Sequence, residues 1–100
     1  MVQIKWLKDA KIDLKEVFEY ISLDSKRYAR LQVERIKLRT GILKTHPKSG
    51  KIVLELENSK IREVIEGNYR IIYKIVNEKR IDILLVHHGA KDLKRRIINI

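Results

Sequence analysis

The chain has 100 residues, 44% of them hydrophobic and 36% charged, which is typical of one globular domain with a modest core. It has no cysteine, which excludes disulfide bridges and thiolate metal sites, and no apolar run approaches the roughly 18 residues of a membrane span. The formal net charge of +10 predicts a polyanionic or acidic partner. Because the first residues also lack the apolar core of a signal peptide, we expect a single cytoplasmic domain over residues 1–100 with no membrane contact.

The first half of the chain predicts a short strand followed by two helices. Met1 to Trp6 alternates apolar and polar residues, as a strand does. From Lys8 to Ser22 apolar residues recur on one helical stripe. A second helix is expected from Lys26 to Thr45, capped by Asp24 or Ser25 and ended by the only proline of the chain.

The second helix has apolar residues on two sides, although packing against a single sheet needs only one. One side holds Ala29, Val33, Ile36 and Leu43, and the opposite side holds Leu31, Leu38 and Ile42. The second group must pack against the first helix or against another chain. We favour packing against the first helix, within one helical hairpin.

Charge differs between the two helical segments. Five acids and two lysines lie between Asp9 and Asp24, whereas nine basic residues and one acid lie between Lys26 and Lys51. The helices are therefore expected to attract each other, with positive charge left over for a partner. Exposed ion pairs contribute only about 0.2–1 kcal/mol each, so this attraction would steer the helices more than stabilise them.

The second half of the chain has the period of two that strands require. The expected segments are an edge strand or extended stretch at Ile52 to Leu56, strands at Ile61 to Glu66, Tyr69 to Val76 and Ile81 to His87, and a basic tail, with a short helix, at Lys91 to Ile98. The strand at Ile81 is the most apolar, which suits a central position.

A two-residue turn at Gly67-Asn68 would set the register of the hairpin around it. Val64 would then face Ile71, on the sheet face that we assign to the core beneath the helices. The other face, which we expect to be open and to carry the functional site, holds Glu63, Arg70, Ile72 and Lys74.

Three motifs follow the helical hairpin in a fixed order. They are Ile61-Arg62-Glu63-Val64, Asn68-Tyr69-Arg70-Ile71-Ile72-Tyr73 and Val86-His87-His88-Gly89-Ala90-Lys91-Asp92-Leu93. Together they resemble the RelE/ParE family of bacterial toxins, the growth-inhibiting half of type II toxin–antitoxin modules, over Trp6 to Leu93. The resemblance implies an α+β fold of order β-α-α-β-β-β, with a helical hairpin packed on a mainly antiparallel sheet. It also implies a cognate antitoxin as partner, a role in plasmid stabilisation, and no cofactor.

The RelE branch cleaves mRNA on the ribosome, which requires an acid, a base and cations for the phosphorane. Arg70 matches an arginine of that branch's catalytic set, and Lys91 stands where the family usually has arginine. His87 or His88 could act as acid or base, since histidine titrates near neutrality. A catalytic site, if the protein is RelE-like, would therefore combine Arg70, His87, His88 and Lys91.

Binding of a nucleic acid or another target would use an overlapping set, Arg62, Tyr69, Arg70 and Lys91, with arginines on phosphate and the tyrosine stacked on a base. However, Glu63 stands where the RelE branch has lysines. A carboxylate opposite Arg70 would pair with it and repel RNA, so a structural Glu63–Arg70 ion pair is an equally good interpretation.

The ParE branch poisons DNA gyrase and is not known for a nuclease site. Two segments match sequence motifs of this branch, Tyr20-Ile21-Ser22-Leu23-Asp24-Ser25 and Leu43-Lys44-Thr45-His46-Pro47-Lys48-Ser49-Gly50. The long hairpin and Glu63 favour this branch, with the RelE-like mRNA endonuclease as the alternative. A plain nucleic-acid-binding domain is a second alternative, although the second helix has no evident helix-turn-helix companion.

An acidic, partly disordered antitoxin would suit the apolar side formed by Leu31, Leu38 and Ile42, next to basic residues. No metal site is expected, because His46 is far in sequence from the other two histidines and no HxxxH or HExxH spacing occurs.

Overall fold

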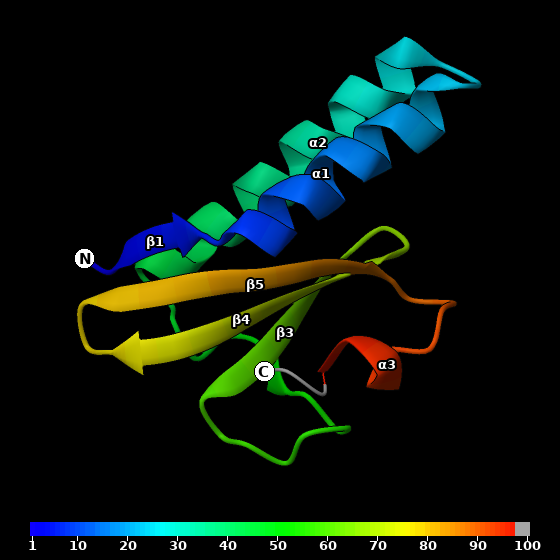
Figure 1. The fold of residues 1–100 in the computed structure, drawn as a ribbon. Helices are drawn as coiled ribbons and strands as arrows, with labels where there is room; N and C mark the ends of the chain where they lie inside the picture. The colour runs from blue at the N-terminus through cyan, green and yellow to red at the C-terminus, as the bar shows by residue number, and fades with distance from the viewer. Residues whose placement is uncertain (98–100) are drawn as a thin grey trace.

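A helical hairpin lies across one face of a five-stranded sheet in the computed structural model, which describes residues 1–97 (Figure 1). The elements are β1 (Gln3–Trp6), α1 (Lys8–Ser22), α2 (Lys26–Gly41), the 3-10 turn η1 (Ile42–Lys44), β2 (Lys51–Ile52), β3 (Ile61–Glu66), β4 (Tyr69–Asn77), β5 (Arg80–His88) and α3 (Lys94–Ile97). The strand order is β1-β5-β4-β3-β2, with β1 parallel to β5 and every other pair antiparallel. The predicted α+β fold is confirmed.

The helices begin where the sequence indicates. Of the two predicted caps of α2, Asp24 and Ser25, the structure shows Ser25, whose hydroxyl accepts the N–H of Tyr28 at 3.2 Å. The α-helical part of α2 ends at Gly41, four residues earlier than expected, because the chain tightens into η1 as it approaches Pro47. None of the helices within residues 1–97 has the length and apolar character that crossing a membrane would need.

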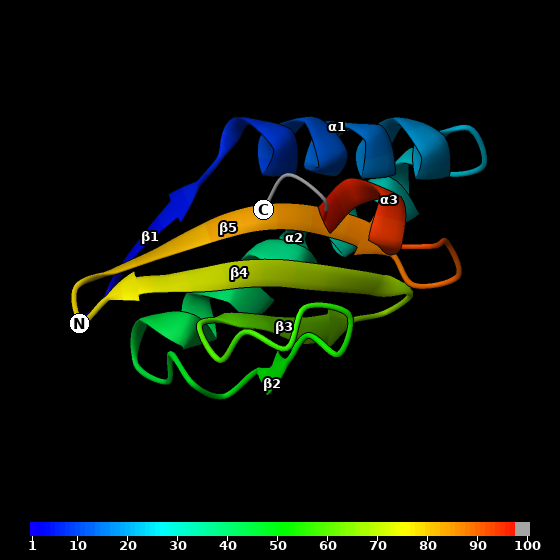
Figure 2. The ribbon, with the colours of Figure 1, turned by 60° about the horizontal axis from the view of Figure 1, so that its bottom comes forward.

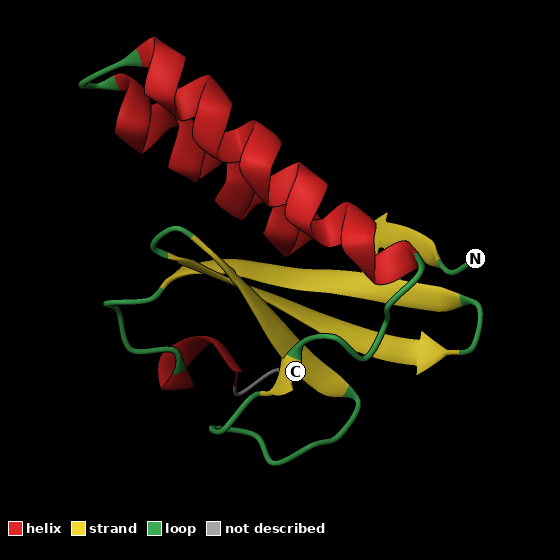
Figure 3. Cartoon of the chain, turned by 180° about the vertical axis from the view of Figure 1, so that it is seen from behind, coloured by secondary structure: helices red, strands yellow, loops and turns green. Residues whose placement is uncertain are grey.

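The main core lies between the hairpin and the sheet. The buried side chains that form it come from both layers: Ala10, Val17, Ile36, Leu43, Val64, Tyr69, Ile71, Tyr73, Ile81, Ile83 and Val86. The two helices run side by side and extend past the sheet at their connecting loop (Figures 1 and 3). The hairpin of β3 and β4 has the predicted register, with Val64 opposite Ile71 and Gly67 in the left-handed region at φ 58°.

The opposite sheet face is covered, contrary to the prediction that it is open. A second cluster of buried side chains lies there: Val53, Ile61, Ile72, Leu85, Leu93 and Ile97. The segment after β2 and the helix α3 lie over this face (Figure 2). They cover it because Val53, Leu93 and Ile97 are apolar residues that bury themselves against Ile72 and Leu85.

Details of the sheet and of the C-terminal tail differ from the sequence interpretation. The expected strand from Ile52 to Leu56 is limited to β2, since the chain turns back after Val53, whose carbonyl accepts N–H groups of Leu56 and Glu57. β5 is an inner strand, but β4 occupies the middle of the sheet. The short helix expected in the tail is α3, and Ile98 lies outside the described residues.

The prediction that the second apolar side of α2 packs against α1 is wrong. Leu38 is 72% exposed and Ile42 is 46% exposed, while Leu31 is half-buried. The reason is geometric: α1 and the sheet both contact the side that carries Ala29 and Ile36, which leaves the opposite side to solvent.

Candidate functional site

Arg70 lies on β4, on the sheet face away from the hairpin, and is bound by two carboxylates. Its Nε donates to Glu63 Oε2 at 2.9 Å, and its Nη1 and Nη2 donate to the two oxygens of Glu55 at 2.8 and 3.0 Å. The Glu63 side chain is buried and the Arg70 side chain is 17% exposed. The predicted Glu63–Arg70 pair is therefore present, and Glu55 is a second partner that the sequence did not indicate.

The pairing of Glu55 with Arg70 shifts the pKa values of both groups toward their charged forms. The hydrogen bonds from Arg70 lower the pKa of the Glu55 carboxyl to about 2, against the opposing effect of burial. The same bonds, first those with Glu55 and then those with Glu63, raise the pKa of Arg70. A phosphate that approached Arg70 would have to displace a carboxylate, so the guanidinium is not a free anion-binding group.

His87 belongs to a second polar cluster, which fastens the C-terminal segment to the rest of the fold. Its Nε2–H donates to the carbonyl oxygen of Lys91 at 2.9 Å, and its Nδ1 accepts from Arg96 at 3.4 Å. Arg96 Nη2 donates to both carboxylate oxygens of Asp13 at 2.7 Å, and Asp13 also accepts the backbone N–H of Val86 at 2.9 Å. Both ring nitrogens of His87 are thus used in internal contacts.

Three other candidate residues, Tyr69, His88 and Lys91, line one cavity of about 740 Å³ between α1 and the end of β5. The rings of Tyr69 and His88 meet edge to face, with centroids 5.4 Å apart, and His88 Nδ1 accepts the N–H of Ala90 at 3.2 Å. Burial raises the pKa of the Tyr69 hydroxyl. The α1 wall of the cavity is acidic, with Asp9 and Glu16, which disfavours a phosphate there.

Arg62 lies apart from these residues and holds a loop. It donates to the carbonyl oxygens of Gly50, Ser59 and Lys48 at 3.0, 3.1 and 3.4 Å. The hydroxyl of Tyr73 binds the same loop, since it donates to the Pro47 carbonyl at 2.7 Å and accepts the N–H of Gly50 at 3.0 Å. The segment from Leu43 to Gly50, which resembles a ParE sequence motif, therefore joins the hairpin to the sheet.

Residues 4–93 match the model of the family described as "ParE toxin of type II toxin-antitoxin system, parDE". The chain belongs to this family. The structure is also similar to a solved chain from the "Chromosomal ParDE TA system from P. aeruginosa", with a TM-score of 0.70 and 21% identity over 88% of this chain and 96% of that chain. At that identity the likeness shows the fold alone. No curated protein sequence matches the chain significantly.

Membership in the ParE family makes the chain a type II toxin, and this agrees with how its polar residues are used. Of the four residues proposed for RNA cleavage, Arg70 and His87 are held by internal partners. His87, His88 and Lys91 line one cavity, and Arg70 is not among its lining residues. Over residues 1–97, no group of three His, Cys, Asp or Glu side chains is placed to hold a metal ion.

Sequence reasoning identified Glu63 as a partner of Arg70 but missed Glu55 and the pairing of Asp13 with Arg96. One signal was available: Asp13 lies on the apolar stripe of α1, three residues after Ala10 and four before Val17. A charged side chain on a buried stripe requires a partner. The partner, Arg96, is 83 residues further on, and Glu55 lies in a loop without a recognisable pattern.

Proposed function

We propose that this ParE-family toxin inhibits DNA gyrase, does not cut mRNA, and is neutralised by a cognate antitoxin. The observation that carries the proposal is the occupation of Arg70 by Glu55 and Glu63. Gyrase inhibition by binding requires no acid–base pair, whereas mRNA cleavage requires one together with cations on the phosphate.

Releasing Arg70 for catalysis would be costly. Glu63 is 4% exposed, and the removal of its partner would leave a buried carboxylate with only Lys51 nearby, at 3.7 Å. Leaving one member of a buried ion pair unpaired typically costs about 3–5 kcal/mol. His88 and Lys91 alone do not supply both the acid–base pair and the phosphate clamp of a metal-free ribonuclease.

The first experiment compares the two targets directly. We expect the purified toxin to block supercoiling by gyrase and to trap cleaved gyrase–DNA complexes, while mRNA on translating ribosomes stays intact. The double variant His88→Ala/Lys91→Ala should leave gyrase inhibition in place, because these groups are not required for a non-enzymatic inhibitor. Ribosome-dependent mRNA cleavage that falls by about 10²–10³ in this variant would instead establish the RelE-like endonuclease.

The antitoxin is proposed to dock on the exposed side of α2 formed by Leu31, Leu38 and Ile42. Leu38 and Ile42 are apolar and exposed, and the basic residues Arg27 and Arg35 lie beside them on the same helix. An acidic helical segment that folds on binding complements both features, with apolar anchors on the leucines and carboxylates on the arginines. A stable complex should bury more than about 1,200 Å² in total.

Leu38→Glu tests this docking site, with Leu54→Glu as its matched control. Both leucines are strongly exposed, at 72% and 80%, but Leu54 lies in the loop after β2. We expect Leu38→Glu to weaken antitoxin binding at least about tenfold, measured by calorimetry, since a charge replaces a central apolar anchor. Equal affinities of the two variants would place the antitoxin elsewhere.

A further inference from the structure

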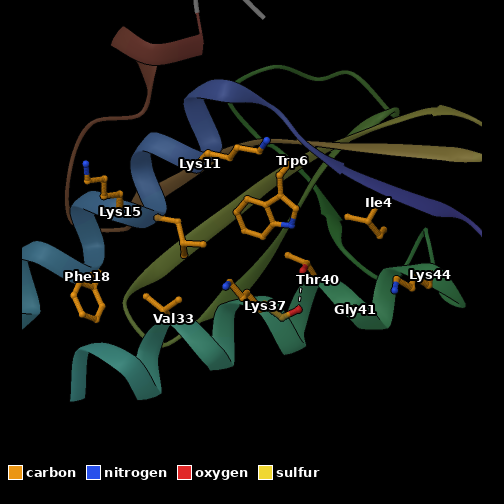
Figure 4. A pocket seen from close by; sticks show the side chains of 11 residues that line it. Ile4, Trp6, Lys11, Lys15, Phe18, Val33, Lys37, Thr40, Gly41 and Lys44 are labelled. Atoms are coloured by element: carbon orange, nitrogen blue, oxygen red, sulfur yellow. Dashed lines mark hydrogen bonds between the residues drawn. The ribbon is translucent and has the colours of Figure 1, made fainter. Parts of the chain in front are cut away.

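A groove between α1, α2 and β1 is bordered by lysines. It has a volume of about 710 Å³, and the residues that line it are Ile4, Trp6, Lys11, Leu14, Lys15, Phe18, Val33, Lys37, Thr40, Gly41 and Lys44. The four lysines come from both helices and η1, and they lie around half-buried apolar side chains that include Trp6 and Val33 (Figure 4). No carboxylate is among the lining residues.

The positive charge continues along α2 beyond the groove. At 100° per residue, Lys26 and Arg30 lie on the same side of the helix as Lys37, and all three are exposed. The row from Lys26 to Lys37 is about 16 Å long at 1.5 Å per residue, and Lys44 follows it in η1. We call the six cations the basic flank: Lys11, Lys15, Lys26, Arg30, Lys37 and Lys44.

The six cations of the basic flank form almost no ion pairs. Within residues 1–97 Lys15 is the only one of the six that does, with Glu19 at 3.9 Å, and both of those side chains are largely exposed. The expected attraction between the helices is not realised as any ion pair within the described part of the chain. The reason is that Lys11 and Lys15 of α1 border the groove beside α2, whereas Asp9 and Glu16 line the cavity beside β5.

Like charges placed this close repel one another, so the basic flank does not stabilise the hairpin. Exposed lysines are also uncommon at the centres of protein–protein interfaces, where their ordering and desolvation are costly. Five of the six cations are lysines, and four of these lysines line the groove. A line of exposed ammonium groups suits a continuous array of phosphates better than an apolar protein surface.

We propose that the basic flank binds the phosphate backbone of double-stranded DNA, so that the toxin contacts the DNA held by gyrase as well as the enzyme. The binding of DNA itself follows from the surface, and its role at gyrase rests on the proposed function. Duplex DNA presents about one negative charge per 1.7 Å of its axis, which offers several phosphates to a row of this length. Contacts of this kind are independent of base sequence.

The test measures binding of the full-length toxin, without gyrase, to a fluorescent duplex of about 30 base pairs over a series of salt concentrations. We expect affinity to fall steeply with salt, with a logarithmic slope of about −0.9 for each phosphate contacted. The variant Arg30→Glu/Lys37→Glu should bind at least about tenfold more weakly. Its salt dependence should be less steep, by the amount that corresponds to the loss of about two phosphate contacts.

The matched control is Lys60→Glu/Arg95→Glu, which changes the net charge by the same amount. Both residues are exposed, and neither side chain has a hydrogen bond or ion pair within the described part of the chain. The loop before β3 and the helix α3 that carry them lie away from the hairpin (Figure 1). We expect this control to keep its affinity within about threefold. Circular dichroism should show both variants folded.

Three outcomes would overturn the inference: no binding at low salt, an equal loss in both variants, or displacement of the duplex by polyglutamate as readily as by unlabelled DNA. The last outcome would assign the basic flank to an acidic protein. Supercoiling assays separate this inference from the proposed function. Duplex binding without gyrase inhibition would support DNA binding by the basic flank but contradict gyrase as the target. Gyrase inhibition without duplex binding would contradict only the DNA-binding inference.

Discussion

Basic residues of the sheet and those of the helix α2 differ in whether they pair with carboxylates. On the sheet and the C-terminal segment, Arg70, Arg80 and Arg96 each bind carboxylates at 3.0 Å or less. On α2, five basic residues are exposed, and none pairs with a carboxylate within residues 1–97: Lys26, Arg27, Arg30, Arg35 and Lys37. The same residue types therefore hold the fold together in one region and remain available to partners in the other.

The difference in pairing arises from where the acidic side chains lie. Glu55 reaches Arg70 from a loop 15 residues earlier, and Asp13 reaches Arg96 across 83 residues. Asp9, Asp13 and Glu16 of α1 are closer to α2 in sequence, yet they line the cavity beside β5. Stability should consequently depend on the paired arginines and hardly at all on the cations of α2.

The largest effect is expected at Arg70. Arg70→Ala should lower the free energy of unfolding by about 3 kcal/mol, because it leaves the buried Glu63 carboxylate without its main partner. Urea denaturation at neutral pH measures this loss. In a double-mutant cycle, adding Glu63→Ala should recover part of it, since the unpaired charge is then removed.

An Arg70→Ala protein as stable as the unmodified toxin would contradict the structural role of the cluster. It would also return Arg70 to the set of residues free to bind an external anion.

The next effect concerns two glycines, one in each region. At Gly50 an added Cβ would lie 2.6 Å from both the Glu63 carbonyl oxygen and the Tyr73 hydroxyl. Neither atom can move easily, since one is backbone and the other is hydrogen-bonded to Pro47. Gly50→Ala should therefore cost about 2 kcal/mol. At Gly41, in the helical hairpin, nothing lies within 4 Å, and Gly41→Ala should stabilise by about 0.5–1 kcal/mol.

Thermal unfolding of the two variants gives the comparison directly, and opposite signs are expected. A stabilising Gly50→Ala would mean that the loop between Pro47 and Gly50 is not fastened to the sheet by Tyr73.

The hairpin and the sheet register were predictable because short-range patterns determine them. Apolar spacing located α1 and α2, Ser25 marked the start of the second helix, and Gly67-Asn68 fixed which residues of β3 and β4 face each other. Each of these signals is contained within a few residues.

The covered face of the sheet and the arginine partners were not predictable in the same way. The apolar residues of α3 and the segment after β2 are too few to show a period, so their place on the second face was not evident. The pairing of Arg70 with Glu55 depends on the path of an irregular loop, and sequence spacing carries no information about that path. Glu55 and the Lys91 carbonyl, which occupy polar atoms of Arg70 and His87, were consequently not foreseen.

Acid titration gives a smaller effect from the same cluster. Glu55 has a pKa of about 2 in the folded protein, against an ordinary value of 4.5, so its ionised form stabilises the fold above about pH 4.5 and that stabilisation is lost as the pH falls toward 2. Because the side chain is 21% exposed and screened by water, we expect a contribution of about 1 kcal/mol.

Glu55→Gln isolates this contribution. The variant should be less stable than the unmodified protein near neutral pH, and the two should converge as the pH falls through about 3 to 2. Urea midpoints over this range measure the difference. A gap that stayed constant down to the lowest pH would show that the carboxylate charge is not what Arg70 stabilises.

The smallest single effect is expected at Arg35 of α2, and it contrasts with the effect expected at Arg80 of the sheet. Arg80→Ala removes the partner of Asp82, whose side chain is only 9% exposed, and should cost about 1–2 kcal/mol. Arg35→Ala removes an exposed side chain that has no carboxylate partner within residues 1–97 and lies one turn away from Arg39, another cation. Its effect should stay within about 0.5 kcal/mol, and relief of repulsion should make it slightly stabilising at low salt. If Arg35→Ala proved as costly as Arg80→Ala, α2 would owe its charge to the fold and not to a partner. If Arg35→Ala is neutral, folding does not require the charge of α2, and binding to a partner of the toxin is the remaining explanation.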